Sequence, residues 1–374
     1  MYKQIDAYIS RLVEESTPER TVWNIEKLRQ GKSASWNYID GCMAAALLGM
    51  EKLTGESRYF DFVERLIDSF VLPDGSIRTY DESKYNLDDV NEGRVLFELY
   101  DRTGKEKYRN AAAVLRGQLE RQMRTEEGSF WHKKIYPNQV WLDGIYMAQP
   151  FYALYELRFG GGDCSDTLRQ IETVYARMRD RKTGLYYHGY DASRRAFWAD
   201  RETGCSKSFW LRSIGWFSVA LADLAEILPR GAQNDRVREI LRELMASVSR
   251  YADGQTGMYW QVVDRGGEEG NYLETSGSCM LAYAMLKGAR LGALEKEYAA
   301  KGRKTFHGIM ERYLSFATGA LNLGGICLVA GLGPETDRRR DGTYAYYISE
   351  PVVQNDAKGV APFLLCYTEI RRDL

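Results

Sequence analysis

The residues with the most chemical promise lie in one stretch, residues 138–150, which reads NQVWLDGIYMAQP. Asp143 stands there directly after two bulky apolar residues, Trp141 and Leu142, at the expected start of a buried helix. A carboxyl group that loses water favours its protonated form, so Asp143 could donate a proton at neutral pH. The position also suits an ordinary helix N-terminal carboxylate, because the helix dipole stabilises the charged form there. These residues alone leave both interpretations open.

Charged residues also stand at the expected starts of the other apolar helices. They are Asp40, Asp88 with Asp89, Arg212, Glu274 and Asp356. Two carboxylates held close together cannot both ionise cheaply, so one of them is pushed to keep a proton. If Asp88 neighbours Asp143, this effect makes Asp143 a candidate general acid and Asp88 its assisting partner. Asp40, Glu274 and Asp356 could equally be helix caps or members of ion pairs.

Cationic and aromatic residues nearby could bind an anionic sugar. Arg212 is flanked by Trp210 and Trp216, and arginine binds carboxylates with two parallel hydrogen bonds. Arg212 could instead pair internally with a carboxylate of the protein. The candidates that precede the expected inner helices are His132, Lys133 and His188, although a lone histidine is more often structural.

Composition excludes several classes of protein. The net charge is −1 and the basic run 338–340 lies between two aspartates, which argues against a nucleic-acid partner. No segment reaches the roughly 20 apolar residues of a membrane span, and the N-terminus lacks the apolar core of a secretory signal. The six cysteines are scattered, and the three histidines lack metal-ligand spacing. We therefore expect a cytoplasmic protein with reduced thiols, no metal and no cofactor.

A repeated two-helix unit would position these residues. Helical periodicity recurs near 3–16, 38–54, 57–70, 86–103, 105–124, 141–159, 164–180, 210–228, 233–253, 274–291, 294–315 and 356–371. The segments alternate between helices that are apolar all round, which should be buried, and amphipathic helices that should cover them. Six such pairs predict an all-α (α/α)6 barrel of six helical hairpins in a single domain, 1–374.

Two further repeats support this architecture. Each expected inner helix has a glycine in its first two turns, as at Gly41 and Gly144, which indicates close backbone approach around a crowded axis. Glycine turns followed by alternating aromatics predict short strands at 75–80, 128–133, 184–189, 257–262 and 342–347. These connections should open at one end of the barrel and form an aromatic funnel, with the candidate residues at its floor.

Three motifs in order carry a resemblance to a known family. They are WLDGIYMAQP at 141–150, WLRSIGW at 210–216, and SEP at 349–351 leading into NDAKG at 355–359. Over nearly its full length the chain resembles the unsaturated rhamnogalacturonyl hydrolases of glycoside hydrolase family 105, which are related to the unsaturated glucuronyl hydrolases.

The resemblance implies a reaction and a set of site residues. An aspartate matched by Asp143 would protonate the C4=C5 vinyl ether of an unsaturated uronic acid, and water would then add at C5. The family's second aspartate matches Asp88. Its sugar-binding positions match His132, Lys133, Trp141, Met147, His188, Trp210, Arg212 and Trp216. No metal or organic cofactor is implied.

The expected substrate is a small unsaturated uronyl disaccharide, most often galacturonyl-rhamnose from pectin. The leaving sugar is open and should depend on rim residues, namely Trp36, Tyr38, Trp260 and Tyr346. Another carbohydrate enzyme on the same barrel remains an alternative: an inverting glycosidase, an epimerase or a lyase. A non-catalytic helical-repeat protein is a weaker one. A monomer and a homodimer are both compatible with the sequence.

Overall fold

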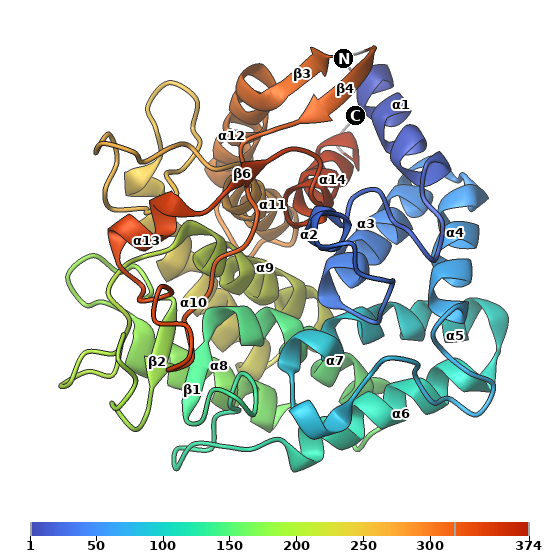
Figure 1. The fold of residues 1–374 in the computed structure, drawn as a ribbon, viewed down its shortest axis with the longest axis horizontal. Helices are drawn as coiled ribbons and strands as arrows, with labels where there is room; N and C mark the ends of the chain where they lie inside the picture. Colours follow the sequence, from blue (N-terminus) through green and yellow to red (C-terminus); the bar gives the residue numbers. More distant parts are fainter. Residues whose placement is uncertain (1, 318, 373–374) are drawn as a thin grey trace.

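Six helical segments pack side by side in a closed ring at the centre of the molecule (Figure 1). The computed structural model describes residues 2–317 and 319–372. Each inner segment contacts the next, and the last contacts the first. In chain order they are α3 (Tyr38–Thr54), η2 (Leu87–Val95) continued by α5 (Leu96–Thr103), α7 (Leu142–Arg158), α9 (Leu211–Ile227), α11 (Thr275–Arg290) and α14 (Ala357–Arg372). The all-α barrel expected from the periodicity is confirmed.

A second layer of amphipathic helices covers this ring. They are α1 (Tyr2–Glu14), α4 (Ser57–Asp68), α6 (Glu106–Arg121), α8 (Ser165–Met178), α10 (Ala232–Val248) and α12 (Glu297–Tyr313). The N-terminal helix α1 packs beside the C-terminal helix α14: the rings of Tyr2 and Tyr367 lie 5.8 Å apart, and the Tyr367 hydroxyl donates to Asp6. The first and last helices together therefore form the sixth pair of the barrel.

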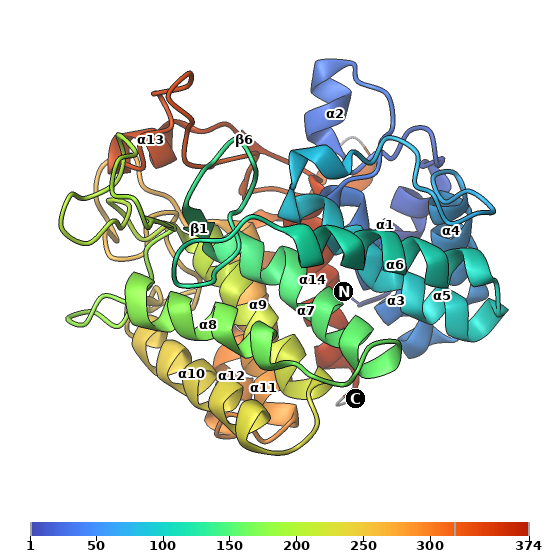
Figure 2. The same ribbon diagram turned by 90° about the horizontal axis from the view of Figure 1, so that it is seen from below.

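The connections between outer and inner helices gather at one end of the ring (Figure 2). They contain three two-stranded antiparallel sheets, formed by β1 (Gln139–Trp141) with β2 (Gly189–Asp191), β3 (Leu314–Ala317) with β4 (Ala320–Leu323), and β5 (Ile326–Cys327) with β6 (Val352–Val353). Short helices also lie in the connections: α2 (Ile25–Gln30), η1 (Glu82–Lys84), η3 (Ser249–Tyr251) and α13 (Tyr344–Ser349). These segments form the walls above the inner helix N-termini.

The expected strands and one expected helix differ in the structure. The segments 75–80, 128–133 and 257–262 form isolated β-bridges and no named strand, and 184–189 overlaps β2 at Gly189 alone. The second inner helix begins as nine residues of 3-10 helix, because apolar spacing at i and i+3 fits both helix types. The segment 342–347, expected as a strand, enters the helix α13 instead. The side chain of Thr343 accepts a hydrogen bond from the backbone N–H of Tyr346, and this N-cap starts the helix despite the alternating tyrosines.

Glycine allows the inner helices to approach closely. A Cβ atom at Gly41 on α3 would lie 2.6 Å from the Cα atom of Glu92 on η2, and one at Gly277 on α11 would lie 2.4 Å from the Leu211 side chain on α9. Neither position has room for a larger residue. The crowded axis expected from the repeated glycines is present at both.

Candidate active site

The expected catalytic residues line a cavity of about 390 Å³ at the end of the barrel that carries the connections. Its volume lies in the range of small-molecule sites. Asp88, on η2, and Asp143, in the first turn of α7, both face it. Five of the expected sugar-binding residues also line the cavity: Tyr38, His132, Lys133, Trp141 and Met147.

Asp143 is placed by the change from strand β1 to helix α7. Its side chain is 13% exposed, and its Oδ2 atom is buried. The Nε2 atom of His188 lies 3.2 Å from this oxygen, but the ring nitrogen is not aligned well enough for a hydrogen bond. Catalytic hydrogen bonds are often poorly aligned before substrate binds and tighten in the complex. Since Oδ2 is buried, the solvent-exposed surface of the Asp143 side chain belongs to its remaining atoms.

His188 lies behind Asp143 and not in the cavity wall. It is fully buried, and its ring contacts Trp141 and Trp210, with centroids 5.3 and 4.7 Å away. Its Nδ1 atom lies 2.7 Å from the hydroxyl oxygen of Tyr347 on α13. The structure therefore places His188 to support Asp143, although the sequence predicted a sugar-binding role.

Asp88 is held in a charged cluster. Its Oδ2 atom lies 2.6 Å from the Lys133 Nζ, and its Oδ1 atom lies 3.5 Å from the His132 Nε2. Burial acts to raise the pKa of Asp88, but the Lys133 ammonium, through its charge and its hydrogen bond, outweighs burial and holds that pKa below its usual range. Burial lowers the pKa of His132 to about 4, so this imidazole is neutral near pH 7. Asp88 is consequently ionised near pH 7.

Asp89 also lines the cavity, next to Asp88 in the chain. Burial, followed by the charge of Asp88, raises the pKa of Asp89 to about 6. The expected mutual effect of two close carboxylates therefore operates between these sequence neighbours.

Aromatic rings form one wall of the cavity. The ring of Trp141 stacks on the rings of His132 and Tyr136, with centroid distances of 4.4 and 4.7 Å, and those two rings are 6.3 Å from each other. Its indole N–H donates to the side chain of Gln139. This three-ring stack fixes the orientation of Trp141 directly before Asp143.

Arg212, Trp210 and Trp216 lie beneath the cavity and do not line it. Arg212 is 2% exposed, and its guanidinium donates to the backbone carbonyls of Cys327 and Leu328. Trp210 stacks with Tyr347 at 5.7 Å, in the layer behind His188.

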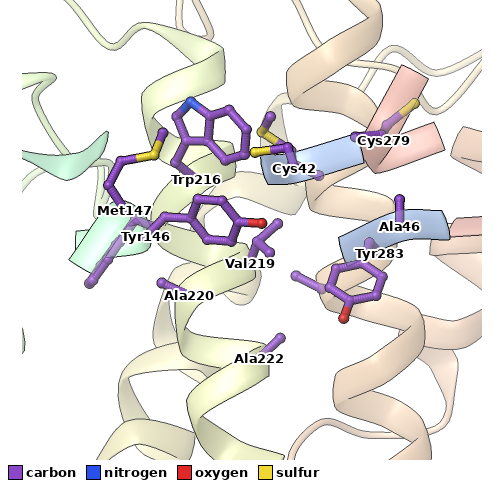
Figure 3. Packing of buried hydrophobic residues seen from close by; sticks show 14 of the residues in the cluster. Cys42, Ala46, Tyr146, Met147, Trp216, Val219, Ala220, Ala222, Cys279 and Tyr283 are labelled. Carbon is purple, nitrogen blue, oxygen red and sulfur yellow. The ribbon is translucent and has the colours of Figure 1, made fainter. Parts of the chain in front are cut away.

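Trp216 is deeper still, 4.6 Å from the ring of Tyr146 in the barrel interior (Figure 3). Met147, which does reach the cavity, points toward the same cluster in this view. Arg212 and Trp216 therefore pack against residues behind the cavity, namely the carbonyls of 327–328 and the ring of Tyr146.

Three of the carboxylates at inner helix starts have structural roles. Asp40 accepts hydrogen bonds from the side chains of Thr21, Trp23, Asn24 and Asn37. Glu274 caps α11 by accepting from the backbone N–H groups of Ser276 and Gly277 and from that of Cys327. Asp356 pairs with Lys358 at 3.1 Å. None of the three lines the cavity: Glu274 is a helix cap, Asp356 is in an ion pair, and Asp40 is held by side-chain hydrogen bonds.

Several wall residues had no signal in the sequence. They are Lys27, Tyr136, Val329, Ala330, Gly331 and Arg340. Most belong to irregular segments, whose course over the barrel does not follow from periodicity. The residues expected at the rim of the funnel lie in different places. Tyr38 lines the cavity, whereas Tyr346 lies behind it, and its hydroxyl oxygen accepts a hydrogen bond from the Gly331 backbone N–H.

The barrel also has a larger cavity, of about 550 Å³, at the opposite end of the ring. It is lined by an ion-pair network in which Asp223 contacts both Arg94 and Lys287. These charged groups satisfy one another.

Within residues 2–317 and 319–372, no three histidine, cysteine, aspartate or glutamate side chains are grouped to hold a metal ion. All six cysteines are buried and unpaired. None of the described helices has the length and apolar character needed to cross a membrane.

Comparison with known proteins identifies the family of the chain. The model of Glycosyl Hydrolase Family 88 matches residues 8–374. Protein Atu3128 of Agrobacterium fabrum is 42% identical over 229 residues, which cover 60% of this chain and 97% of that protein.

Solved structures add two relatives. A glycoside hydrolase from family 105 of C. acetobutylicum ATCC 824 is 38% identical, with a TM-score of 0.89 and coverage of 98% of this chain and 100% of that one. The unsaturated glucuronyl hydrolase of Bacillus sp. GL1 shares the fold, at 14% identity and a TM-score of 0.66 over 100% and 97% of the two chains. The chain therefore belongs to the glycosyl hydrolases of families 88 and 105.

Proposed function

We propose that this enzyme releases a Δ4,5-unsaturated uronic acid from the non-reducing end of small oligosaccharides produced by polysaccharide lyases. The observation that carries the proposal is the position of Asp143, a partly exposed carboxyl group at the floor of a sugar-sized cavity beside an aromatic wall. The name of the Bacillus relative, unsaturated glucuronyl hydrolase, is consistent with the same type of reaction.

In the proposed reaction, Asp143 transfers its proton to C4 of the vinyl ether. Positive charge then develops at C5 and the ring oxygen, and water adds at C5 while its proton goes to the Asp143 carboxylate. The hemiketal formed at C5 opens, and the leaving sugar departs with a free hydroxyl group. Asp143 ends the cycle protonated, as it began.

Asp88 has a separate role in this scheme. As an ionised carboxylate of the cavity, it stabilises the positive charge that develops on the substrate ring. Its pairing with Lys133 keeps it charged near neutral pH. The proposed reaction needs one proton donor and one fixed negative charge. Because nothing is displaced at the anomeric carbon, the usual relation between carboxylate separation and glycosidase mechanism does not apply.

We further propose that the leaving sugar is rhamnose from rhamnogalacturonan, the pectin component. The resemblance to the unsaturated rhamnogalacturonyl hydrolases supports this choice, and so does the 38% identity to a family 105 enzyme. Tyr38, Tyr136 and the residues of the 329–331 loop are placed to contact a second sugar ring, because they line the cavity beside the catalytic carboxylates.

The variant Asp143→Asn tests the assignment of the acid. We expect turnover to fall by at least about 10²–10⁴-fold, the contribution of general acid–base catalysis, while disaccharide binding measured by calorimetry persists. Asp200→Asn is a matched control, because Asp200 is an exposed turn residue outside the cavity. Near-normal turnover of Asp143→Asn would refute the role of Asp143.

A panel of lyase-generated disaccharides tests the reaction type and the leaving sugar together. Loss of the double bond is followed by ultraviolet absorbance, and we expect the highest kcat/KM with galacturonyl-rhamnose. A saturated disaccharide of the same composition serves as the control. Cleavage of that compound at a comparable rate would show an ordinary glycosidase instead.

A further inference from the structure

Tyr347 contacts the catalytic machinery from outside the cavity. It lies on α13, is fully buried and does not line the cavity. Its hydroxyl oxygen is 2.7 Å from the Nδ1 atom of His188, a residue 159 positions earlier in the chain. The Nε2 atom of that imidazole faces the buried Oδ2 atom of Asp143 at 3.2 Å. A continuous polar chain thus runs from α13 through His188 to the proposed acid.

The direction of the first hydrogen bond follows from burial. Burial raises the pKa of Tyr347 well above its ordinary range, and the neighbouring Tyr346 and Asp143 act in the same direction, so the hydroxyl keeps its proton. Within the described residues, the hydrogen bond recorded for this hydroxyl is the one to His188. Because a buried hydroxyl donates wherever an acceptor is available, Tyr347 donates to Nδ1. A neutral imidazole that accepts at Nδ1 carries its hydrogen on Nε2.

We propose that Tyr347 is a positioning residue that fixes the tautomer of His188 and thereby selects the oxygen of Asp143 that carries the transferable proton. The Nε2–H group lies 3.2 Å from Oδ2 but is not aligned with it in the structure; we expect the two to align when substrate binds, which makes Oδ2 the accepting oxygen. The proton of the acid is then confined to Oδ1, the oxygen that can reach the cavity. The proposal rests on the function proposed above.

The same arrangement assists proton transfer. When Oδ1 gives its proton to C4 of the substrate, the negative charge left on the carboxylate is stabilised by the Nε2–H group. Neither Tyr347 nor His188 changes its number of protons during this step. In the opposite tautomer, Nε2 would accept a hydrogen bond from Oδ2–H, and the acid would hold its proton toward the protein interior and away from the substrate.

The variant Tyr347→Phe removes the donor and keeps the ring. We expect kcat to fall by about 10- to 100-fold, as for one buried polar group left unsatisfied, with KM unchanged because the residue does not line the cavity. Tyr186→Phe is the matched control: Tyr186 is a fully buried tyrosine two positions before His188, and its hydroxyl has no hydrogen-bond partner among the described residues. Its kcat should stay near the wild-type value.

A double variant shows whether Tyr347 acts through His188. His188→Gln alone should lower kcat without raising KM, and adding Tyr347→Phe to it should cost no further activity, since the link is already broken. Melting midpoints of all variants are compared so that unfolding is not mistaken for lost catalysis. If Tyr347→Phe unfolds the enzyme, the kcat and KM of His188→Gln still test the link.

The outcomes separate the two proposals. If the wild-type enzyme is active and Tyr347→Phe has the same kcat as Tyr186→Phe, the proposed role of Tyr347 is wrong. It is also wrong if Tyr347→Phe raises KM and leaves kcat unchanged. Fully multiplicative losses in the double variant overturn it as well. A wild-type enzyme that consumes no unsaturated disaccharide overturns the proposed function instead.

Discussion

Replacing Lys133 by methionine would test the charge balance of the site most directly. The variant keeps most of the side chain's length and apolar stem but removes the ammonium group that lies 2.6 Å from Asp88. Asp88 would remain 14% exposed, with the neutral His132 as its nearest titratable neighbour. The pKa of Asp88 should therefore rise, because burial is no longer outweighed by a cation.

The size of the stability loss follows from the burial of the pair. Two unit charges 4 Å apart interact by about 4 kcal/mol at an effective dielectric constant of 20, and desolvation offsets part of this. Removing one partner of a buried pair costs about 3–5 kcal/mol. Lys133 keeps 24% of its side chain exposed, so we expect the lower end, about 3 kcal/mol at pH 7.

The sign of the pH dependence is also fixed. In the wild type, the lowered pKa of Asp88 contributes stability that is fully present above its unfolded pKa of about 3.9 and is lost only below that value. In the variant, burial raises the pKa of Asp88 above its unfolded value, so Asp88 takes up a proton before pH 4 is reached and part of the deficit disappears. The difference between wild type and Lys133→Met, measured by urea unfolding, should therefore shrink from pH 7 toward pH 4. Turnover of the variant should also fall, because a protonated Asp88 no longer supplies a negative charge.

Lys84→Met provides the matched control. Lys84 is 65% exposed and lies 3.8 Å from Asp81, so losing this surface pair should cost between 0 and about 1 kcal/mol. Equal losses for the two lysine variants at pH 7 would refute the argument from burial. So would a Lys133→Met deficit that stays constant down to pH 4.

Three other predictions concern stability. Ionisation of Asp89 destabilises the fold, because its pKa is raised to about 6. The free energy of unfolding of Asp89→Asn, measured with urea, should therefore exceed that of the wild type by up to about 3 kcal/mol at pH 8 and by much less at pH 4. Gly41→Ala should lower the free energy of unfolding by about 1–3 kcal/mol, seen as a lower melting midpoint, because the new Cβ would overlap Glu92. An unchanged midpoint would contradict the close approach of α3 and η2 at this glycine. Asp223→Ala should lower the free energy of unfolding by about 3–5 kcal/mol, because it leaves Arg94 without its carboxylate and Lys287 with Glu226 as its remaining one. KM should be unaltered in the variant that still folds, and a changed KM would link the opposite cavity to catalysis.

The repeating part of the fold was accessible from the sequence. Apolar periodicity, alternating helix character and regularly placed glycines follow from local physics, and they predict the six helical pairs and their ring. The same reasoning failed where short-range signals compete. Thr343 caps a helix within an alternating aromatic run, and the 3-10 segment at 87–95 has the same i, i+3 spacing as an α-helix.

Reasoning from the sequence reached the residues that line the cavity and missed the arrangement of those packed behind them. Asp88, Asp143 and the five wall residues line the cavity because each lies before an inner helix or within its first two turns. The side to which a buried residue turns depends on long-range packing, which a single sequence does not reveal. This is why Arg212 was expected in contact with substrate but binds the carbonyls of Cys327 and Leu328 instead. Tyr347 gave no signal either, because its partner is 159 residues away.

The closure of the inner ring by the first and last inner helices has a consequence for how the molecule forms. Helix α3 contacts η2, which follows it closely, and α14, which begins about 300 residues later in the chain. During synthesis, one apolar side of α3 must therefore remain uncovered until nearly the whole chain has been made. Contacts of such long sequence separation form slowly, and chains of this size commonly pass through intermediates with exposed apolar surface. Chaperone demand should consequently be greatest for the nascent N-terminal half, and it should end only when α14 docks.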